Sequence, residues 1–122
     1  MKHFEGNYKI KGIVDIIDYN TNKKGKVFKI GQMKITKLKN YFYNVEMEID
    51  ISKNIVSDKK NIILKNVFLF NNKKLEGSFN ERNNSLIYYL KKKLYTKFIH
   101  KTYNKEKNQN FVFYGKLRLY KH

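Results

Sequence analysis

The stretch YFYNVEMEIDIS, residues 41–52, decides the fold of this chain because apolar and polar side chains alternate along it. Successive side chains of a strand point to opposite faces, whereas a helix would mix the two kinds on every side. One face of the predicted strand carries Tyr43, Val45, Met47, Ile49 and Ile51, and the other carries Asn44, Glu46, Glu48 and Asp50. The pattern predicts a strand buried on one side only.

The same alternation recurs near both ends of the chain. From Phe4 to Ile16, one face holds Phe4, Tyr8, Ile10, Val14 and Ile16 together with Gly6 and Gly12. From Phe111 to Leu119, one face holds Phe111, Phe113, Leu117 and Leu119. A period of two at the start, middle and end of the chain predicts an all-β protein.

Turn signals separate these runs at regular intervals and divide the chain into eight predicted strands. They are clusters of Asn, Gly and Lys in a chain without proline. The predicted strands cover residues 4–18, 26–38, 41–51, 61–70, 73–79, 85–91, 94–103 and 111–121. Short, evenly spaced strands indicate an antiparallel up-and-down meander that closes as a barrel, with a β-sandwich as the alternative. Residues 1–122 form one domain in either case.

The segment SLIYYLKKKLYTKFIHKTY, residues 85–103, also allows a basic helix near 85–100. Leucine or phenylalanine recurs at spacing four from Leu86 to Phe98, and Ser85 could cap the helix. A helix would, however, scatter Tyr88 and Ile99 to the side opposite that stripe. We therefore favour two strands here.

Residues 62–70 are apolar on both faces of their predicted strand. Such a strand is expected to be covered on both sides or to line a dry cavity.

The first strand opens with Phe4-Glu5-Gly6-Asn7-Tyr8, and Arg118 lies on the last. An eight-stranded meander with these features resembles the calycin superfamily of lipocalin-like barrels. In that family a Gly-x-Trp motif on the first strand is covered by a basic residue from the last. Tyr8 stands where the family has tryptophan. The resemblance implies an interior that accommodates one small molecule.

The composition points to an anionic partner. Twenty-seven Lys and Arg against ten Asp and Glu give a net charge of +17, which is typical of proteins that bind polyanions. Codon bias of an AT-rich genome, such as that of a low-GC bacterium, a protozoan, a phage or a large DNA virus, explains part of the lysine excess. Without cysteine, a leader-like run or a membrane-span-length apolar segment, we expect a cytoplasmic protein, in the host cytoplasm if viral.

No arrangement of residues predicts catalysis, a metal site or a cofactor. The three histidines, His3, His100 and His122, are far apart in the sequence. The acidic stripe Glu46, Glu48 and Asp50 is expected to pair with lysines of neighbouring strands rather than to bind a cation. Asp15 and Asp18 are interpreted in the same way. We therefore predict that the protein is not an enzyme.

Basic and aromatic residues interleave on the last two predicted strands. Rings stack on bases while cations meet phosphates, so this combination on one sheet face predicts an anion or nucleic-acid site. The predicted site residues are Tyr95, Lys97, Lys101, Tyr103, Tyr114, Lys116, Arg118 and Tyr120. The two sets share a face only in the register that also aligns Leu94 and Phe98 with Phe113 and Leu117.

The sequence thus predicts a non-enzymatic basic binding module for a phosphate-bearing ligand, either a nucleotide or single-stranded nucleic acid. Two alternatives remain open. One is a calycin-like carrier of a small apolar ligand, with Phe68, Phe70, Met47 and Phe113 lining its pocket. The other is a structural or virion subunit whose charge balances packaged nucleic acid. The sequence does not predict an oligomeric state.

Overall fold

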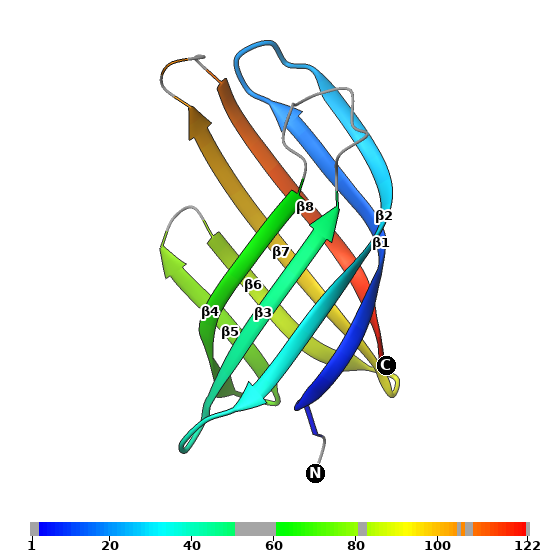
Figure 1. Cartoon of the computed structure of the whole chain (residues 1–122), viewed down its shortest axis with the longest axis vertical. Coiled ribbons are helices and arrows are strands. Elements are labelled where there is room, and N and C mark those ends of the chain that lie inside the picture. Colours follow the sequence, from blue (N-terminus) through cyan, green and yellow to red (C-terminus); the bar gives the residue numbers. More distant parts are fainter. Residues whose placement is uncertain (1–2, 51–60, 81–82, 105, 107–108, 122) are drawn as a thin grey trace.

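A computed structural model describes residues 3–50, 61–80, 83–104, 106 and 109–121, which form eight strands and no helix (Figure 1). The strands are β1 (Gly6–Asp18), β2 (Lys24–Lys37), β3 (Phe42–Asp50), β4 (Asn61–Asn71), β5 (Lys74–Asn80), β6 (Asn83–Leu90), β7 (Lys93–Asn104) and β8 (Gln109–Lys121). Each predicted strand end lies within two residues of the observed one.

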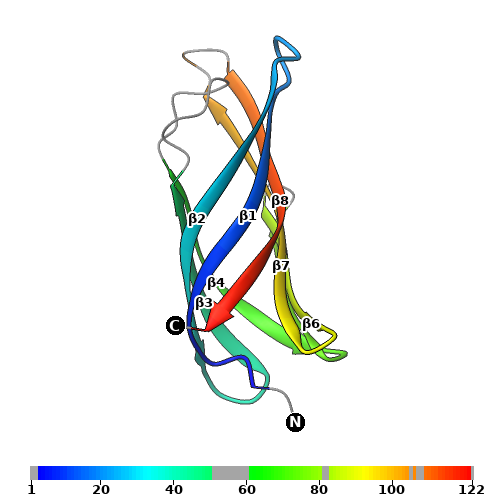
Figure 2. The same ribbon diagram turned by 90° about the vertical axis from the view of Figure 1, so that its right-hand side faces the viewer.

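The strands form a closed antiparallel barrel in which each strand pairs with the next and β8 returns to β1 (Figures 1 and 2). This confirms the predicted up-and-down meander and excludes both the sandwich and the helix near 85–100. That segment forms β6 and β7, because two strands can turn Leu94 and Phe98 inward while Tyr95 and Lys97 point out. The described residues contain no helix with the length and hydrophobicity needed to cross a membrane.

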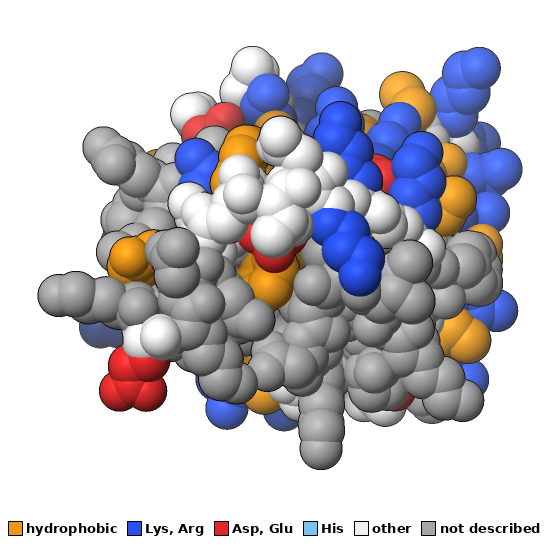
Figure 3. All heavy atoms as spheres, turned by 90° about the horizontal axis from the view of Figure 1, so that it is seen from above, with side chains coloured by type: hydrophobic (Ala, Val, Ile, Leu, Met, Phe, Trp, Pro, Cys, Tyr) orange, Lys and Arg blue, Asp and Glu red, His pale blue; other side chains and the backbone are white. Residues whose placement is uncertain are grey.

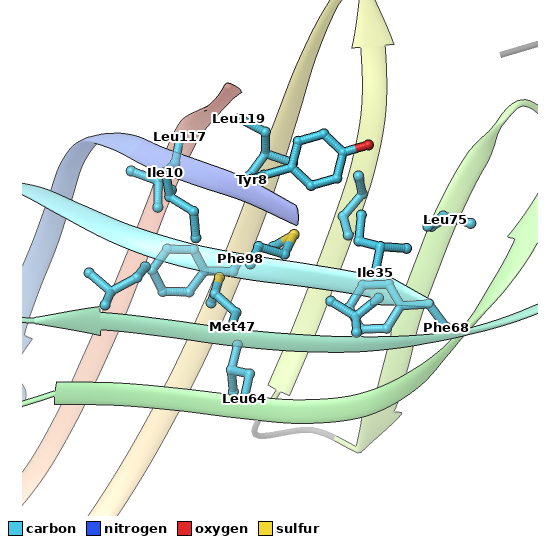
Figure 4. Close-up of a cluster of buried hydrophobic side chains, with 14 of the residues drawn as sticks. Tyr8, Ile10, Ile35, Met47, Leu64, Phe68, Leu75, Phe98, Leu117 and Leu119 are labelled. Atoms are coloured by element: carbon cyan, nitrogen blue, oxygen red, sulfur yellow. The ribbon is translucent and has the colours of Figure 1, made fainter. Parts of the chain in front are cut away.

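The inward side chains of all eight strands build the core. Ile10, Ile35, Leu75 and Phe113 are each at most 1% exposed. Figure 4 shows side chains from several strands meeting in this interior, among them Met47 from β3. The faces predicted to be apolar on β1, β3 and β8 are the ones turned to the core, with Tyr43 partly buried. Ile51 of the predicted β3 face lies outside the described residues.

The outer face of β4 corrects one expectation. The sequence predicts that residues 62–70 are covered on both sides or line a dry cavity, yet Ile63, Val67 and Leu69 are 50%, 40% and 40% exposed. The wall of a barrel is a single sheet, so every second side chain points away from the core whatever its chemistry. Among the side chains of β4 that the structure describes, Leu64 and Phe68 are the buried ones.

An aromatic cluster fills the end of the barrel next to the N-terminus. Phe4 precedes β1, is 2% exposed, and packs against Tyr43, Phe70 and Tyr89 with ring centroids 6.2, 5.9 and 5.3 Å away. The Tyr8 hydroxyl donates a 2.6 Å hydrogen bond to the Phe4 carbonyl. Figure 2 shows both chain ends at this end of the molecule. The N-terminal segment therefore acts as a plug.

The ladders of paired residues that join the strands of the wall differ in length. The β1–β8 ladder runs without interruption from Tyr8↔Lys121 to Asp18↔Phe111. In contrast, the ladder recorded between β4 and β5 has only three pairs, from Leu69↔Glu76 to Asn71↔Lys74. The shortest ladder of the barrel wall thus lies between β4 and β5, on the side opposite the longer β1–β8 ladder.

The first testable prediction concerns Gly77, which faces the Phe68 ring inside the barrel. A Cβ at residue 77 would lie 2.5 Å from two carbons of that ring. We expect Gly77→Ala to lower the free energy of unfolding by about 1–3 kcal/mol, since a packed ring has no room to move. Urea denaturation measures the loss. Adding Phe68→Leu should recover part of it, and additive losses in the double variant would contradict this contact.

A second prediction concerns Tyr8. Burial, and to a lesser extent the nearby Tyr89, raises the pKa of the Tyr8 phenol to about 12. The unfolded chain loses this proton near pH 10. Stability should therefore fall as the pH rises from about 10 toward 12, because the unfolded state binds fewer protons there.

Urea unfolding at several pH values checks this prediction by comparison with Tyr8→Phe. The lysines titrate in both proteins, so the difference isolates Tyr8. The variant should be less stable by a constant amount near neutral pH and should approach the parent protein at high pH. Two parallel stability curves would be incompatible with a buried, protonated Tyr8.

Candidate functional site

The outer surface of β6, β7, β8 and β1 carries tyrosine rings and cations side by side. Because β8 pairs with both β7 and β1, side chains from four strands lie in neighbouring rows on this surface. Figure 2 looks at the outside of β8 and β1. We call this surface the basic–aromatic face and define it by Tyr88, Tyr95, Lys97, Tyr114, Lys116, Arg118, Tyr120, Lys9 and Lys11.

The register aligns these residues in rows across the strands. One row runs from Tyr88 through Tyr95 and Arg118 to Lys11. The next row runs from Leu86 through Lys97 and Lys116 to Ile13, and a third from Ile99 through Tyr114 to Asp15. This is the register in which the predicted β7 and β8 sets share a face.

Four cations rest on tyrosine rings within the basic–aromatic face. Lys97 Nζ lies 5.8 Å from the Tyr88 centroid, and Lys116 Nζ lies 5.2 Å from that of Tyr95. The Tyr88 and Tyr95 rings stack on each other, with centroids 6.0 Å apart. Such contacts hold a cation in place without neutralising it, because a ring offers a quadrupole rather than a charge.

Tyr120 organises the other edge of the face. The Arg118 guanidinium carbon lies 4.4 Å from the Tyr120 centroid, and Lys11 Nζ lies 5.4 Å from it. One ring from β8 therefore supports a cation from its own strand and one from β1.

Lys97 and Lys116 face each other directly across β7 and β8. Like charges in directly opposed positions destabilise a sheet. Their neighbours in the same row are Leu86 and Ile13, which cannot neutralise them. Asp15 is diagonal to Lys116 and forms an ion pair with Lys26, 3.8 Å away. The pair of lysines is thus an electrostatic cost in the free protein that a bound anion would relieve.

The structure brings together six of the eight predicted site residues. Tyr95 and Lys97 from β7 lie beside Tyr114, Lys116, Arg118 and Tyr120 from β8. Lys101 and Tyr103 are also exposed on the outer face but lie further along β7, opposite Val112 and Asn110.

Sequence reasoning missed Tyr88, Lys9 and Lys11. Lys9 and Lys11 could have been placed on the outer face from the sequence, because side chains alternate along a strand and Tyr8 and Ile10 point inward. Their position next to Tyr120 and Arg118, however, depends on barrel closure. Tyr88 enters the face because it lies opposite Tyr95.

Arg118 does not occupy the position that the calycin resemblance implies. Tyr8 points into the barrel and is 4% exposed, whereas Arg118 is on the outside and stacks on Tyr120. The residue of β8 opposite Tyr8 is Lys121. The alternation of side chains along β8 explains why Arg118 is not next to Tyr8: residues 118 and 121 are an odd number of positions apart and so point to opposite faces.

The predicted pairing of the acidic stripe with lysines holds for one of its three residues. Glu46 lies between Lys34 and Lys65 in the register, as expected for cross-strand charge pairing. In contrast, Glu48 lies between Gln32 and Ile63 and accepts a hydrogen bond from the Asn61 amide, and Asp50 lies opposite Asn61. Asp18 accepts a hydrogen bond from the backbone N–H of Asn20 in the turn after β1. Within the described ranges, no three His, Cys, Asp or Glu side chains gather closely enough to hold a metal ion.

No protein-family model, curated protein or solved structure matches this chain.

A third prediction follows from the facing lysines. Lys97→Glu should raise the free energy of unfolding by about 0.5 kcal/mol at low salt, because an opposed repulsion becomes an attraction that outweighs the lost ring contact. Urea denaturation measures the gain. Lys97→Gln should lie between the two proteins, and about 1 M salt should abolish the differences. A Glu variant less stable than the Gln variant would argue against the opposed pair.

Proposed function

We propose that this protein binds single-stranded nucleic acid on its basic–aromatic face and acts as a binding module rather than as an enzyme. The observation that carries the proposal is the grouping of cations and tyrosine rings on the outer face of four neighbouring strands. A nucleic-acid strand presents both phosphates and flat bases, so both of its chemical parts find partners here.

The charges on the basic–aromatic face are suited to phosphate. Lys97, Lys116, Arg118 and Lys11 are held on rings rather than by carboxylates. A cation that is not neutralised by an acid keeps its full attraction for an incoming phosphate. Figure 3, a view onto the end of the barrel, shows Lys and Arg side chains gathered among hydrophobic ones on its right-hand side, which is the side of β1, β2 and β8 in Figure 1.

The aromatic side chains are suited to bases. Tyr114 and Tyr120 are each 38% exposed, so they offer accessible ring area. Because every base has a flat face, stacking on such rings tolerates any sequence and requires unpaired bases. A strand is favoured over a free nucleotide because the face extends over several rows of side chains.

A second candidate is the calycin-like carrier of a small apolar ligand, which the closed eight-stranded barrel favours. Phe68, Met47 and Phe113 do point into the interior. However, Phe70 packs against the Phe4 plug at the end near the N-terminus, and Phe68 packs over Gly77. These contacts occupy part of the space that a ligand would need, so we prefer the outer face.

The fourth prediction is a salt-dependent affinity for single strands. If about four phosphates are neutralised, the affinity of a fluorescently labelled oligonucleotide should fall roughly 50-fold between about 50 and 200 mM salt. Fluorescence anisotropy measures this slope. Lys97→Glu combined with Arg118→Glu should abolish binding at the higher salt concentration, and a duplex of the same length should bind more weakly because its bases are already stacked.

The matched control is Lys39→Glu combined with Lys73→Glu, which makes the same change in net charge at two exposed turn residues outside the face. It should retain most of the affinity. Equal losses of affinity in the two double variants would mean that overall charge alone drives binding, and would overturn the site. Native mass spectrometry of the purified protein tests the other candidates, since a bound lipid would support the carrier and large assemblies would support a structural subunit.

A further inference from the structure

A groove lies within the basic–aromatic face, with a volume of about 480 Å³. Its lining includes Leu86, Ile99, Tyr114, Lys97, Lys116 and Asp15. These side chains come from four strands and lie in two neighbouring rows of the barrel surface. The volume is within the range of roughly 300–1,000 Å³ found for small-molecule sites.

The walls of the groove are suited to a flat, weakly polar ring. Leu86 and Ile99 supply aliphatic surface, and Ile99 is 43% exposed. Tyr114 lies directly opposite Ile99 and provides a ring for stacking. An aliphatic wall and an aromatic wall together favour a planar ring that enters between them.

The charges of the groove are divided between its sides. Lys97 and Lys116 lean toward the rings of Tyr88 and Tyr95, on the side of the neighbouring row. Asp15 lies on β1 next to Tyr114. One side of the groove is therefore cationic, and the other carries a single carboxylate. A nucleotide has this same polarity, because its phosphate is anionic while the edge of its base can donate hydrogen bonds.

Asp15 has capacity to accept a further hydrogen bond. Its side chain is 24% exposed, and its recorded ion pair with Lys26 is long, at 3.8 Å. A carboxylate has about four lone-pair sites, of which this contact takes one. A carboxylate on a surface that binds polyanions opposes that binding unless it contacts something specific, and an amino group on a base is such a partner.

Building on the proposed function, we propose that this groove holds one unpaired base of the strand and that Asp15 selects bases with an exocyclic amino group. Cytosine and thymine differ at this point in a simple way. Cytosine presents an amino donor at the position where thymine presents a carbonyl oxygen. The carboxylate accepts from the first and repels the second, so the protein prefers cytosine.

The test is to measure the affinities of cytosine and thymine homopolymers of equal length by fluorescence anisotropy. The parent protein should bind the cytosine strand about tenfold more tightly, the value expected for one hydrogen bond at a partly exposed site. Asp15→Asn should bring the two affinities close together, because an amide can donate to the thymine carbonyl as well as accept from cytosine.

The control is Glu76→Gln, which removes an acid two strands from Lys97 in the same row but outside the groove. It should strengthen the binding of both strands equally and leave the tenfold preference unchanged. Tyr114→Ala should weaken both by about tenfold through lost stacking. If both strands bind equally well to the parent protein, the base site is overturned while the proposed function stands. If neither strand binds, the proposed function fails with it.

Discussion

The pairing of the first strand with the last is the constraint on which the rest of this structure depends. It closes the sheet, so that every backbone position between Tyr8 and Asp18 has a partner on each side. Closure fixes which side chains are inside, because a slip of one residue would turn the apolar set of β1 toward solvent. It also determines the outer neighbours, since Lys11 reaches the Tyr120 ring only across this ladder.

Charge alone does not distinguish one part of this protein from another, because lysine is distributed over the whole chain. What differs from place to place is the kind of side chain that lies next to each lysine. On β2 and β4, Lys34 and Lys65 flank Glu46, so a carboxylate lies opposite each of them. On β7 and β8 the cations rest on rings instead. The same residue type therefore stabilises the wall in one place and is available to a ligand in the other.

Most of the fold could be predicted from the sequence because one face of nearly every strand is buried, which imposes a period of two. Which side chains of the site point outward could be predicted for the same reason, and matching the apolar faces of β7 and β8 predicts the register that joins them.

What could not be predicted depends on contacts between residues far apart in the sequence. The alternation predicts that Phe4 starts the first strand, whereas Phe4 is a plug held by three rings. The apolar outer face of β4 predicts a second layer over that strand, but the wall of a barrel is a single sheet. Asp15 could not be placed beside Tyr114 before closure was known.

The ladders of the barrel wall leave one side weaker than the rest. The β4–β5 ladder is short, whereas the β1–β8 ladder on the opposite side of the barrel is unbroken. Local opening is easiest where the fewest backbone hydrogen bonds must break, so we expect it between β4 and β5 before it occurs between β1 and β8. A nucleic-acid strand bound outside β8 and β1 would not obstruct such an opening.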